Sequence, residues 1–449
     1  MNPFEVIIYS VVHLNRTYQL YILFALNILF PFVLRAQEIV QMTVHSGESF
    51  YVHPEGNVAV FSDLNNSGSL GTYNNSTINF LGQRWNNMSG SRIVDESANG
   101  LSGTGGTIRF SASNSSQIIN TLNSAQANIG FPNITLANPQ NLVLQGNDLL
   151  VRRSFNFENG KVILNNRNTI MQTGANIAGF DNNKYFVTGT ATTGGSLIRR
   201  TSGSQNTQII FPLGSTVGSY TPASIIYTGI AQDLKLRVFD NVYDKATFGN
   251  PDNVNFVTKT WNLSLTNLDP NANLVLSAQH NSSEEGSQFT ADKTKSFLSR
   301  YQSNIEKWDS TNGTGLTPGI ISSGSPIPGA YINTRTITAG LGLNEYFSKS
   351  VVKENVLANY RVPVGISPNN DGLNDKFVIE NLKATDKVRI DIYNRWQSLV
   401  FRDTDYKNTF EGIGNQQGLV NNNLPDGTYY YILHFNDSKP VTGYIIINR

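Results

Sequence analysis

The chain has 449 residues with 33 basic and 32 acidic side chains, a formal net charge of +1 at neutral pH. Without a charge excess it lacks the means to hold nucleic acid or acidic lipid electrostatically, so we expect neither as a partner. It has no cysteine, which excludes disulfides, thiolate metal sites and a cysteine nucleophile. Abundant Gly, Asn, Ser and Thr favour turns and strands over helices, and the length allows two or three domains. We therefore predict an all-β protein.

Residues 1–36 are predicted to be an export signal peptide. The apolar stretch 21–34 is too short and too interrupted for a spanning helix, which needs about 20 residues. The small residue Ala36 precedes Gln37, so we expect cleavage between them. The alternative is an uncleaved membrane anchor. Loss of residues 1–36 removes two basic side chains and one acidic side chain, which leaves 31 of each and a net charge of zero.

Residues 37–200 contain short apolar segments separated by Asn- and Gly-rich turns. The later segments follow one another at about seven to ten residues, a spacing too tight for intervening helices. We predict a right-handed β-solenoid, in which each coil buries its apolar residues by stacking on the next, with a plain β-sandwich as the alternative. The segments are 58–61, 78–81, 107–110, 134–136, 142–144, 149–151 and 161–164.

One interval within this region, 113–130, has a different pattern. Ile118, Ile119, Leu122 and Ala125 recur at helical spacing. The pattern is compatible with one short helix or with a loop between two coils.

Residues 201–344 show longer alternating segments between turn signals, which predict an antiparallel β-sandwich. Trp261 and Trp308 alternate with polar residues and are interpreted as core aromatics. The alternative is a carbohydrate-stacking platform. Residues 345–361 are polar, lack a strong period and are predicted to be a linker.

Residues 362–449 combine tight turns with strand-like runs. Asn369 to Gly372 is dense in residues that tolerate left-handed backbone angles, and Pro425-Asp426-Gly427 is a turn in which proline presets one angle and glycine takes the strained one. The segment 388–393 alternates with the period of a strand that has one buried face, and 429–435 is rich in aromatic and β-branched residues.

The order of these motifs, SPNNDGLND, YNRW, LPDGTYYY and a terminal GYIIINR, resembles the gliding-motility-associated C-terminal domain, the type B sorting domain of the Bacteroidetes type IX secretion system. The resemblance implies a small Ig-like β-sandwich that directs the chain to the cell surface or the medium. It implies the outer-membrane translocon and its accessory proteins as partners. The implied motif residues are Pro368, Asn369, Asp371, Gly372, Asn374, Asp375, Asn394, Arg395, Trp396, Pro425, Asp426, Gly427, Tyr429, Tyr431, Gly443 and Tyr444.

The sequence departs from the family pattern at two places. The family usually has glycine after the Arg-Trp pair, where this chain has Gln397, and Trp-Asp-Gly before the PDG turn, where it has Phe410-Glu411-Gly412. Both lie inside the motif frame, so they affect the details of recognition and leave the family resemblance intact.

The weak metal candidate is a calcium site made by Asn369, Asp371, Asn374 and Asp375, whose oxygens recur around a turn. The favoured alternative is an Asx-turn network, in which these side chains bind nearby backbone N–H groups. No other cofactor is expected.

The sequence has no His-Glu-x-x-His, glycine-rich phosphate loop or nucleophile elbow. The acid pairs Asp95-Glu96, Glu284-Glu285 and Asp403 with Asp405 are interpreted as solvated loop residues. We therefore expect a non-enzymatic adhesin that binds surface glycans. The alternatives are a polysaccharide lyase or hydrolase built on the solenoid, and a structural component of the cell envelope.

Overall fold

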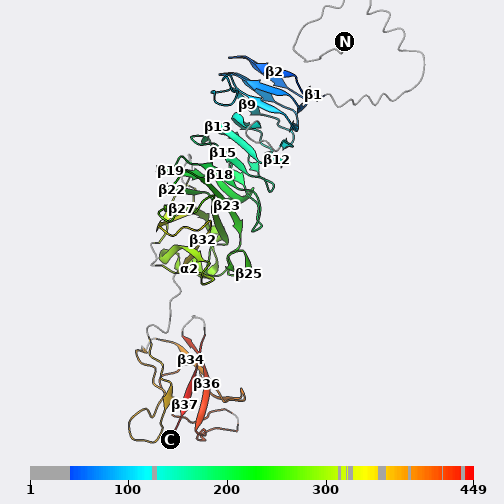
Figure 1. Cartoon of the computed structure of the whole chain (residues 1–449). Helices are drawn as coiled ribbons and strands as arrows, with labels where there is room; N and C mark the ends of the chain where they lie inside the picture. The colour runs from blue at the N-terminus through cyan, green and yellow to red at the C-terminus, as the bar shows by residue number, and fades with distance from the viewer. Residues whose placement is uncertain are drawn as a thin grey trace, which may run out of the picture. The chain divides into compact units, whose positions relative to one another are not determined.

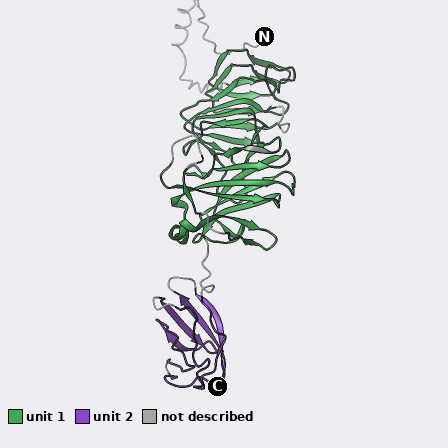
Figure 2. Ribbon diagram, turned by 90° about the vertical axis from the view of Figure 1, so that its left-hand side faces the viewer, with its two compact units in different colours: residues 1–352 green, residues 353–449 purple. Residues whose placement is uncertain are grey.

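A computed structural model describes residues 41–123, 129–311, 315–319, 321, 327–351, 360–382, 386–416, 418–435 and 440–449. The chain divides into two compact units, 1–352 and 353–449, which are coloured separately in Figure 2. In both units the regular secondary structure of the described residues is almost wholly β-strand, as predicted. Within the described residues, every helix is too short or too polar to span a bilayer. The predicted signal peptide, with Ala36 and Gln37, lies outside the described residues.

The first unit begins as a parallel β-solenoid, whose turns are stacked from blue to green in Figure 1. Its first turn passes through β1 (Gln41–Val44), β2 (Ser49–Val52) and β3 (Asn57–Val60). Each strand pairs in parallel with the strand at the same place in the next turn. A three-stranded sheet ends at β8 (Arg92–Val94), and two larger sheets continue through the later turns.

Within the described residues these sheets have the following members. The three-stranded sheet is β2, β5 (Ser69–Thr72) and β8. The nine-stranded sheet is β1, β4 (Asp63–Asn66), β7 (Arg84–Asn87), β10 (Gln117–Thr121), β12 (Leu142–Gly146), β14 (Val162–Ile163), β17 (Phe186–Val187), β20 (Leu213–Thr216) and β21 (Ser219–Tyr220). The solenoid part of the thirteen-stranded sheet is β3, β6 (Thr77–Phe80), β9 (Thr107–Phe110), β11 (Phe131–Ala137), β13 (Leu149–Asn159), β15 (Thr169–Met171) and β18 (Leu197–Arg200), with β16 (Asn176–Ala178) beside β13.

Alternation within very short strands builds the solenoid core. In β6, Ile78 and Phe80 are buried while Thr77 and Asn79 face outward. Successive side chains of a strand point to opposite faces, so four residues contribute two side chains to the interior. Stacking brings Trp85 to 5.4 Å from Phe80 and 5.6 Å from Phe131, between ring centroids. A single turn could not bury these rings, and the stack of turns does.

Within the interval 113–130, the part that carries Ile118 and Ile119 is extended. Residues 117–121 form strand β10, which pairs in parallel with β7 and β12. Ile119 faces the core and Leu122 is exposed, so the helical spacing of Ile118, Ile119 and Leu122 does not form one apolar helix face. The two neighbouring strands together supply hydrogen-bond partners to the backbone of β10, and this pairing overrides the local pattern. Residues 124–128 lie outside the described residues.

The predicted sandwich region continues the solenoid without a break in the sheet. Strand β18 pairs in parallel with β15 on one side and antiparallel with β23 (Asp233–Asp240) on the other. Beyond β23 the described part of the sheet contains β26 (Lys259–Leu265), β32 (Asn344–Val351), β28 (Ser296–Gln302) and β29 (Lys307–Trp308). Solenoid and sandwich regions share one hydrophobic core and one compact unit.

A second antiparallel sheet packs on this extension, and both contribute to the shared core. Trp261 is fully buried in it and donates its indole N–H to the Thr221 carbonyl at 3.0 Å. Trp308 is half-buried between Phe256 and Tyr301. Trp261 is therefore a core aromatic, as expected, whereas Trp308 lies on the edge strand β29 and outside the buried clusters. Among the described residues, this sheet and the remaining elements of the unit are β19 (Gln205–Phe211), β22 (Ala223–Thr228), β27 (Asn273–Asn281), β31 (Ala330–Thr338), β30 (Thr317–Pro318), the hairpin β24 (Tyr243–Lys245) and β25 (Phe248–Pro251), and the short helices η2 (Ser282–Glu284), α2 (Ser287–Asp292) and η3 (Lys293–Lys295).

The predicted linker 345–361 is wrong in its first part. Residues 344–351 form β32, a central strand between β26 and β28. The segment looked polar because it carries Ser348 and Lys349, which are fully buried and hydrogen-bonded. The Lys349 ammonium nitrogen lies 2.8 Å from His280 Nδ1, and His280 Nε2 lies 3.2 Å from Glu285 Oε1. Residues 352–359 lie outside the described residues.

The second unit is built on one sheet. Within its described residues the strand order is β33 (Gly365–Ile366), β37 (Val441–Ile447), β36 (Gly427–Phe435), β34 (Val388–Tyr393) and β35 (Leu399–Asp403). One face of this sheet packs on Phe377, Tyr406, Phe410 and Leu424, which come from irregular segments. The second layer of the expected sandwich is therefore made of irregular chain in the described part of the unit. Within the described residues of the unit, the other face of the sheet carries exposed side chains.

Candidate functional site

Exposed aromatic residues gather on the other face of the sheet in the second unit. Tyr430 and Tyr444 are a directly opposed cross-strand pair and are 52% and 49% exposed. Tyr429 and Tyr431, singled out from the sequence, face the core instead. The strand period of two settles this, because neighbours of an inward residue must point outward. Sequence reasoning therefore missed Tyr430, although counting alternation along 429–435 could have found it.

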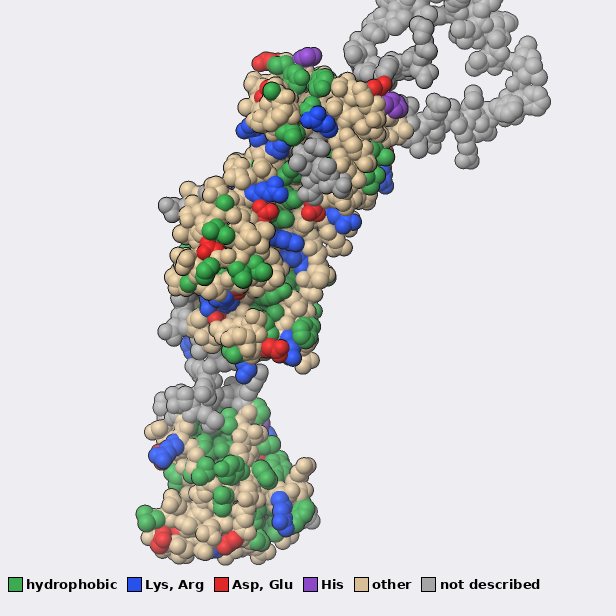
Figure 3. All heavy atoms as spheres, viewed as in Figure 1, with side chains coloured by type: hydrophobic (Ala, Val, Ile, Leu, Met, Phe, Trp, Pro, Cys, Tyr) green, Lys and Arg blue, Asp and Glu red, His purple; other side chains and the backbone are tan. Residues whose placement is uncertain are grey.

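A shallow groove of about 800 Å³ runs over this face. Three of the four predicted motifs meet in it: the turn after β34, strand β36 and strand β37. The surface view of the second unit shows hydrophobic side chains gathered together (Figure 3). The lining residues are Tyr393, Asn394, Arg395, Gln397, Tyr430, Tyr431, Ile432, Thr442, Gly443 and Tyr444.

The turn beside the groove is fixed by Asn394. Its side-chain oxygen accepts hydrogen bonds from the backbone N–H groups of Trp396 and Ser398, both at 3.0 Å. Gln397 has a φ of 64°, in the left-handed region that glycine adopts without strain. This explains why the family usually has glycine at this position. Trp396 is 70% exposed, and the Arg395 guanidinium lies 4.2 Å from its ring centroid.

Gly443 is required by the packing of Tyr431. The two residues are opposed across β36 and β37, and a Cβ at position 443 would lie 2.2 Å from Tyr431 Oη. We predict that Gly443→Ala lowers the free energy of unfolding of the second unit by about 1–3 kcal/mol, since the ring must move. Urea unfolding of the full chain, followed by near-UV circular dichroism, measures this. Thr442→Ala, at the adjacent exposed position, is the matched control, and an equal loss in both variants would contradict the packing argument.

The loop 369–375 forms a network of Asx turns. Asp375 Oδ1 accepts from the backbone N–H groups of Asn369 and Asn370, and its Oδ2 accepts from that of Gly372. Asp371 Oδ1 accepts from the N–H of Leu373 at 2.8 Å. The carboxylates that would serve the calcium candidate therefore hold the loop together. The fourth member, Asn374, adopts a left-handed φ of 55° and its carbonyl accepts from Ser367. Pro368 stands at the start of this loop.

The PDG turn is tied to the end of the chain. The Arg449 guanidinium donates to the carbonyls of Leu424 and Gly412 and lies 3.3 Å from the Asp426 carboxylate. Gly427, after Pro425 and Asp426, begins β36. At the second departure from the family pattern, Phe410 is fully buried in the core of the unit, with its ring centroid 4.7 Å from that of Phe401.

Two of the acid pairs expected to be solvated contain buried residues. Asp95 is buried and forms an ion pair with Arg152 at 3.3 Å, which fastens the loop 95–106 to the solenoid. Glu284 and the side chain of Glu285 are also buried. Burial of these acids is tolerable because basic side chains distant in the sequence pair with them. Two adjacent acids in a sequence do not identify those partners.

Outward amide side chains form a ladder on the nine-stranded sheet of the solenoid. Asn65 donates to Gln41 at 2.8 Å, Asn86 donates to Asn65 at 2.7 Å, and Asn120 donates to Asn86 at 3.0 Å. The parallel register places Gln145 next in this row. A neighbouring row of half-buried apolar residues is formed by Ile118, Val143 and Ile163.

The second unit brings the four predicted motifs together in one small compact unit. Residues 360–447 match the family model of the CHU_C type IX secretion signal domain. The chain thus carries a type IX secretion signal and is exported by that machinery to the cell surface or beyond. No curated protein and no solved structure matches the chain in the corresponding searches.

Proposed function

We propose that the exported protein is a non-enzymatic adhesin whose solenoid binds glycans along the nine-stranded sheet. The observation that carries this proposal is the amide ladder of Gln41, Asn65, Asn86 and Asn120. Strands in a sheet lie about 4.8 Å apart, so the ladder repeats the same polar group at a fixed interval.

The ladder leaves hydrogen-bonding capacity for a ligand. A primary amide has two N–H donors and an oxygen with two lone pairs, and each inner rung, Asn65 and Asn86, uses one donor and one lone pair for its neighbours. The remaining donor and lone pair suit sugar hydroxyls, which both donate and accept. The adjacent row of Ile118, Val143 and Ile163 offers apolar contact to the C–H faces of the same sugars.

The test is retention on a panel of immobilised algal, plant and bacterial polysaccharides. We predict that Asn86→Ala weakens retention about tenfold or more, since it removes the middle rung and the bonds on both sides of it. Asn79→Ala is the matched control, because Asn79 donates to Asn57 at 2.6 Å in an equivalent pair on the thirteen-stranded sheet. Absence of retention on every polysaccharide, or equal losses in both variants, would overturn the proposal; the former outcome favours a structural role in the envelope.

The same panel tests the enzyme alternative. A lyase or hydrolase needs acidic or basic groups that converge on one bond. Among the described residues of the solenoid, the ion pairs Arg109–Glu158, Arg152–Asp95 and Lys184–Asp181 each join opposite charges. Release of reducing ends or unsaturated products from any polysaccharide would favour the enzyme over the adhesin.

A further inference from the structure

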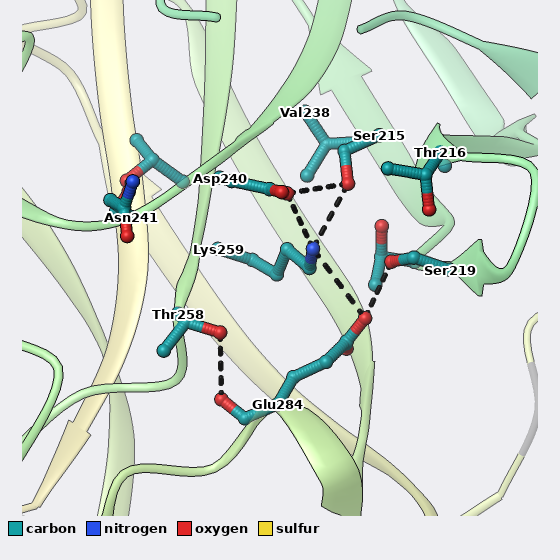
Figure 4. A network of polar contacts seen from close by, with 12 residues as sticks. Ser215, Thr216, Ser219, Val238, Asp240, Asn241, Thr258, Lys259 and Glu284 are labelled. Atoms are coloured by element: carbon teal, nitrogen blue, oxygen red, sulfur yellow. Dashed lines mark hydrogen bonds and ion pairs between the residues drawn. The ribbon is translucent and has the colours of Figure 1, made fainter. Parts of the chain in front are cut away.

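We propose that Lys259 and Asp240 join covalently through an isopeptide bond between β26 and β23, with Glu284 as the proton carrier. The three side chains converge in the polar network of Figure 4. The bond would be an amide between Lys259 Nζ and Asp240 Cγ, formed by the protein itself.

The reacting groups are already in contact. Asp240 and Lys259 are directly opposed in the antiparallel register of β23 and β26. Lys259 Nζ lies 2.5 Å from Asp240 Oδ1, and the lysine side chain is 7% exposed. Reacting groups held in contact within one molecule lose little further freedom on the way to the transition state, which favours even a slow condensation.

The hydrogen-bond network holds Ser215 and Glu284 beside the two side chains that would react. The Ser215 hydroxyl donates to Asp240 Oδ1 at 2.6 Å and accepts from Lys259 Nζ at 2.9 Å. Glu284 Oε1 lies 3.7 Å from Lys259 Nζ and accepts from the Ser219 hydroxyl at 2.5 Å. Glu284 Oε2 is held by the backbone N–H of Asn281 at 2.8 Å. The buried Glu284 carboxylate therefore lies beside the Lys259 amine, whereas the closest ion-pair partner of that amine is Asp240.

The condensation balances without any external reagent. The Lys259 ammonium passes a proton to the Glu284 carboxylate, and the neutral amine attacks Asp240 Cγ. One C–N bond forms and one C–O bond breaks. The two protons that the nitrogen loses leave with one Asp240 oxygen as water, carried by Glu284. The products are an uncharged amide and water, so the step removes two opposite charges from a poorly hydrated site.

A cross-link here would suit an exported chain that contains no cysteine. It would close the loop 240–259, which carries the hairpin β24–β25. Like a disulfide, it would stabilise the fold chiefly by restricting the unfolded chain.

Mass spectrometry of a tryptic digest of the purified full chain tests the proposal. Trypsin cannot cleave after an amidated Lys259, so the expected product is residues 238–245 joined to residues 246–293, lighter by one water molecule. Unmodified peptides 238–245 and 246–259 as the only products would overturn the proposal.

Variants separate the reacting groups from the proton carrier. Asp240→Ala abolishes the joined peptide. Glu284→Gln slows its formation by about 10²-fold or more, the usual contribution of a positioned acid–base group. Glu285→Gln is the matched control, since Glu285 contacts His280 and Lys293 instead of Lys259, and it retains the cross-link. Full cross-linking in Glu284→Gln, with the variant folded by circular dichroism, would overturn the role of Glu284.

Discussion

Deletion of residues 362–449 is expected to stop export at the outer membrane, so that the protein accumulates in the periplasm. The type IX secretion signal lies within 360–447. The first unit keeps its own core without it, because the buried clusters of the two units share no residue. Deletion of the sorting signal is therefore not expected to unfold the first unit. The measurement is the distribution of a tagged protein among periplasm, cell surface and medium in a host with type IX secretion.

The reciprocal experiment tests whether the second unit directs the export of an unrelated protein. A reporter protein that follows residues 1–40 and precedes residues 353–449 is expected to reach the surface or the medium. Circular dichroism of the truncated chain checks that the first unit still folds. Normal surface display of a folded truncated form would remove the sorting function from the second unit.

Acid is expected to destabilise the first unit through His280. This residue is fully buried, and burial, followed by the nearby Lys349, lowers its pKa from an ordinary 6.5 to about 3. The tautomer with a proton on Nε2 accepts from Lys349 at Nδ1 and donates to Glu285. Protonation of Nδ1 would place an N–H donor opposite the Lys349 donor, which disfavours the protonated imidazole in the folded state.

The sign follows from proton binding. Between pH 6.5 and about 3 the unfolded chain carries a proton on this imidazole and the folded chain does not. The free energy of unfolding therefore falls as the pH falls through this window, by up to about 1.4 kcal/mol per pH unit from His280 alone. Above pH 6.5 His280 contributes no pH dependence.

Urea unfolding at a series of pH values, followed by tryptophan fluorescence, tests this effect. His280→Gln keeps an acceptor for Lys349 and a donor for Glu285 but cannot titrate, so its stability is expected to decline less steeply in acid. The exposed His53 provides the matched control as His53→Gln, with the slope of the wild type. Parallel pH profiles for wild type and His280→Gln would contradict the prediction.

The features that the sequence predicts well are those carried by local pattern. Short alternating segments between Asn and Gly turns indicated the solenoid, because period two and frequent turns are properties of the chain itself. The turns around Asp371 and Gly427 were equally local. The strand 344–351 was missed because its buried Ser348 and Lys349 look like a loop until their partners on other elements are known.

The candidate sites depend more on distant pairing. Ladder residues such as Asn65 and Asn86 are 21 positions apart, and the register that aligns them is set by the whole coil. The contact of Lys259 with Asp240 and Glu284 joins three elements, and no spacing rule links them. The residue types of both sites can be read from the sequence, but the proximity of these residues is set by the fold.

The stacking of solenoid turns gives the protein a simple route to change in evolution. Each turn contacts its neighbours through parallel strands, so duplication of one turn would add a rung to each large sheet and leave the others in register. The antiparallel strands after β18 close one end of the stack, whatever its length. Related proteins could therefore have longer or shorter solenoids, with longer or shorter rows of amide groups, while retaining the same closing end.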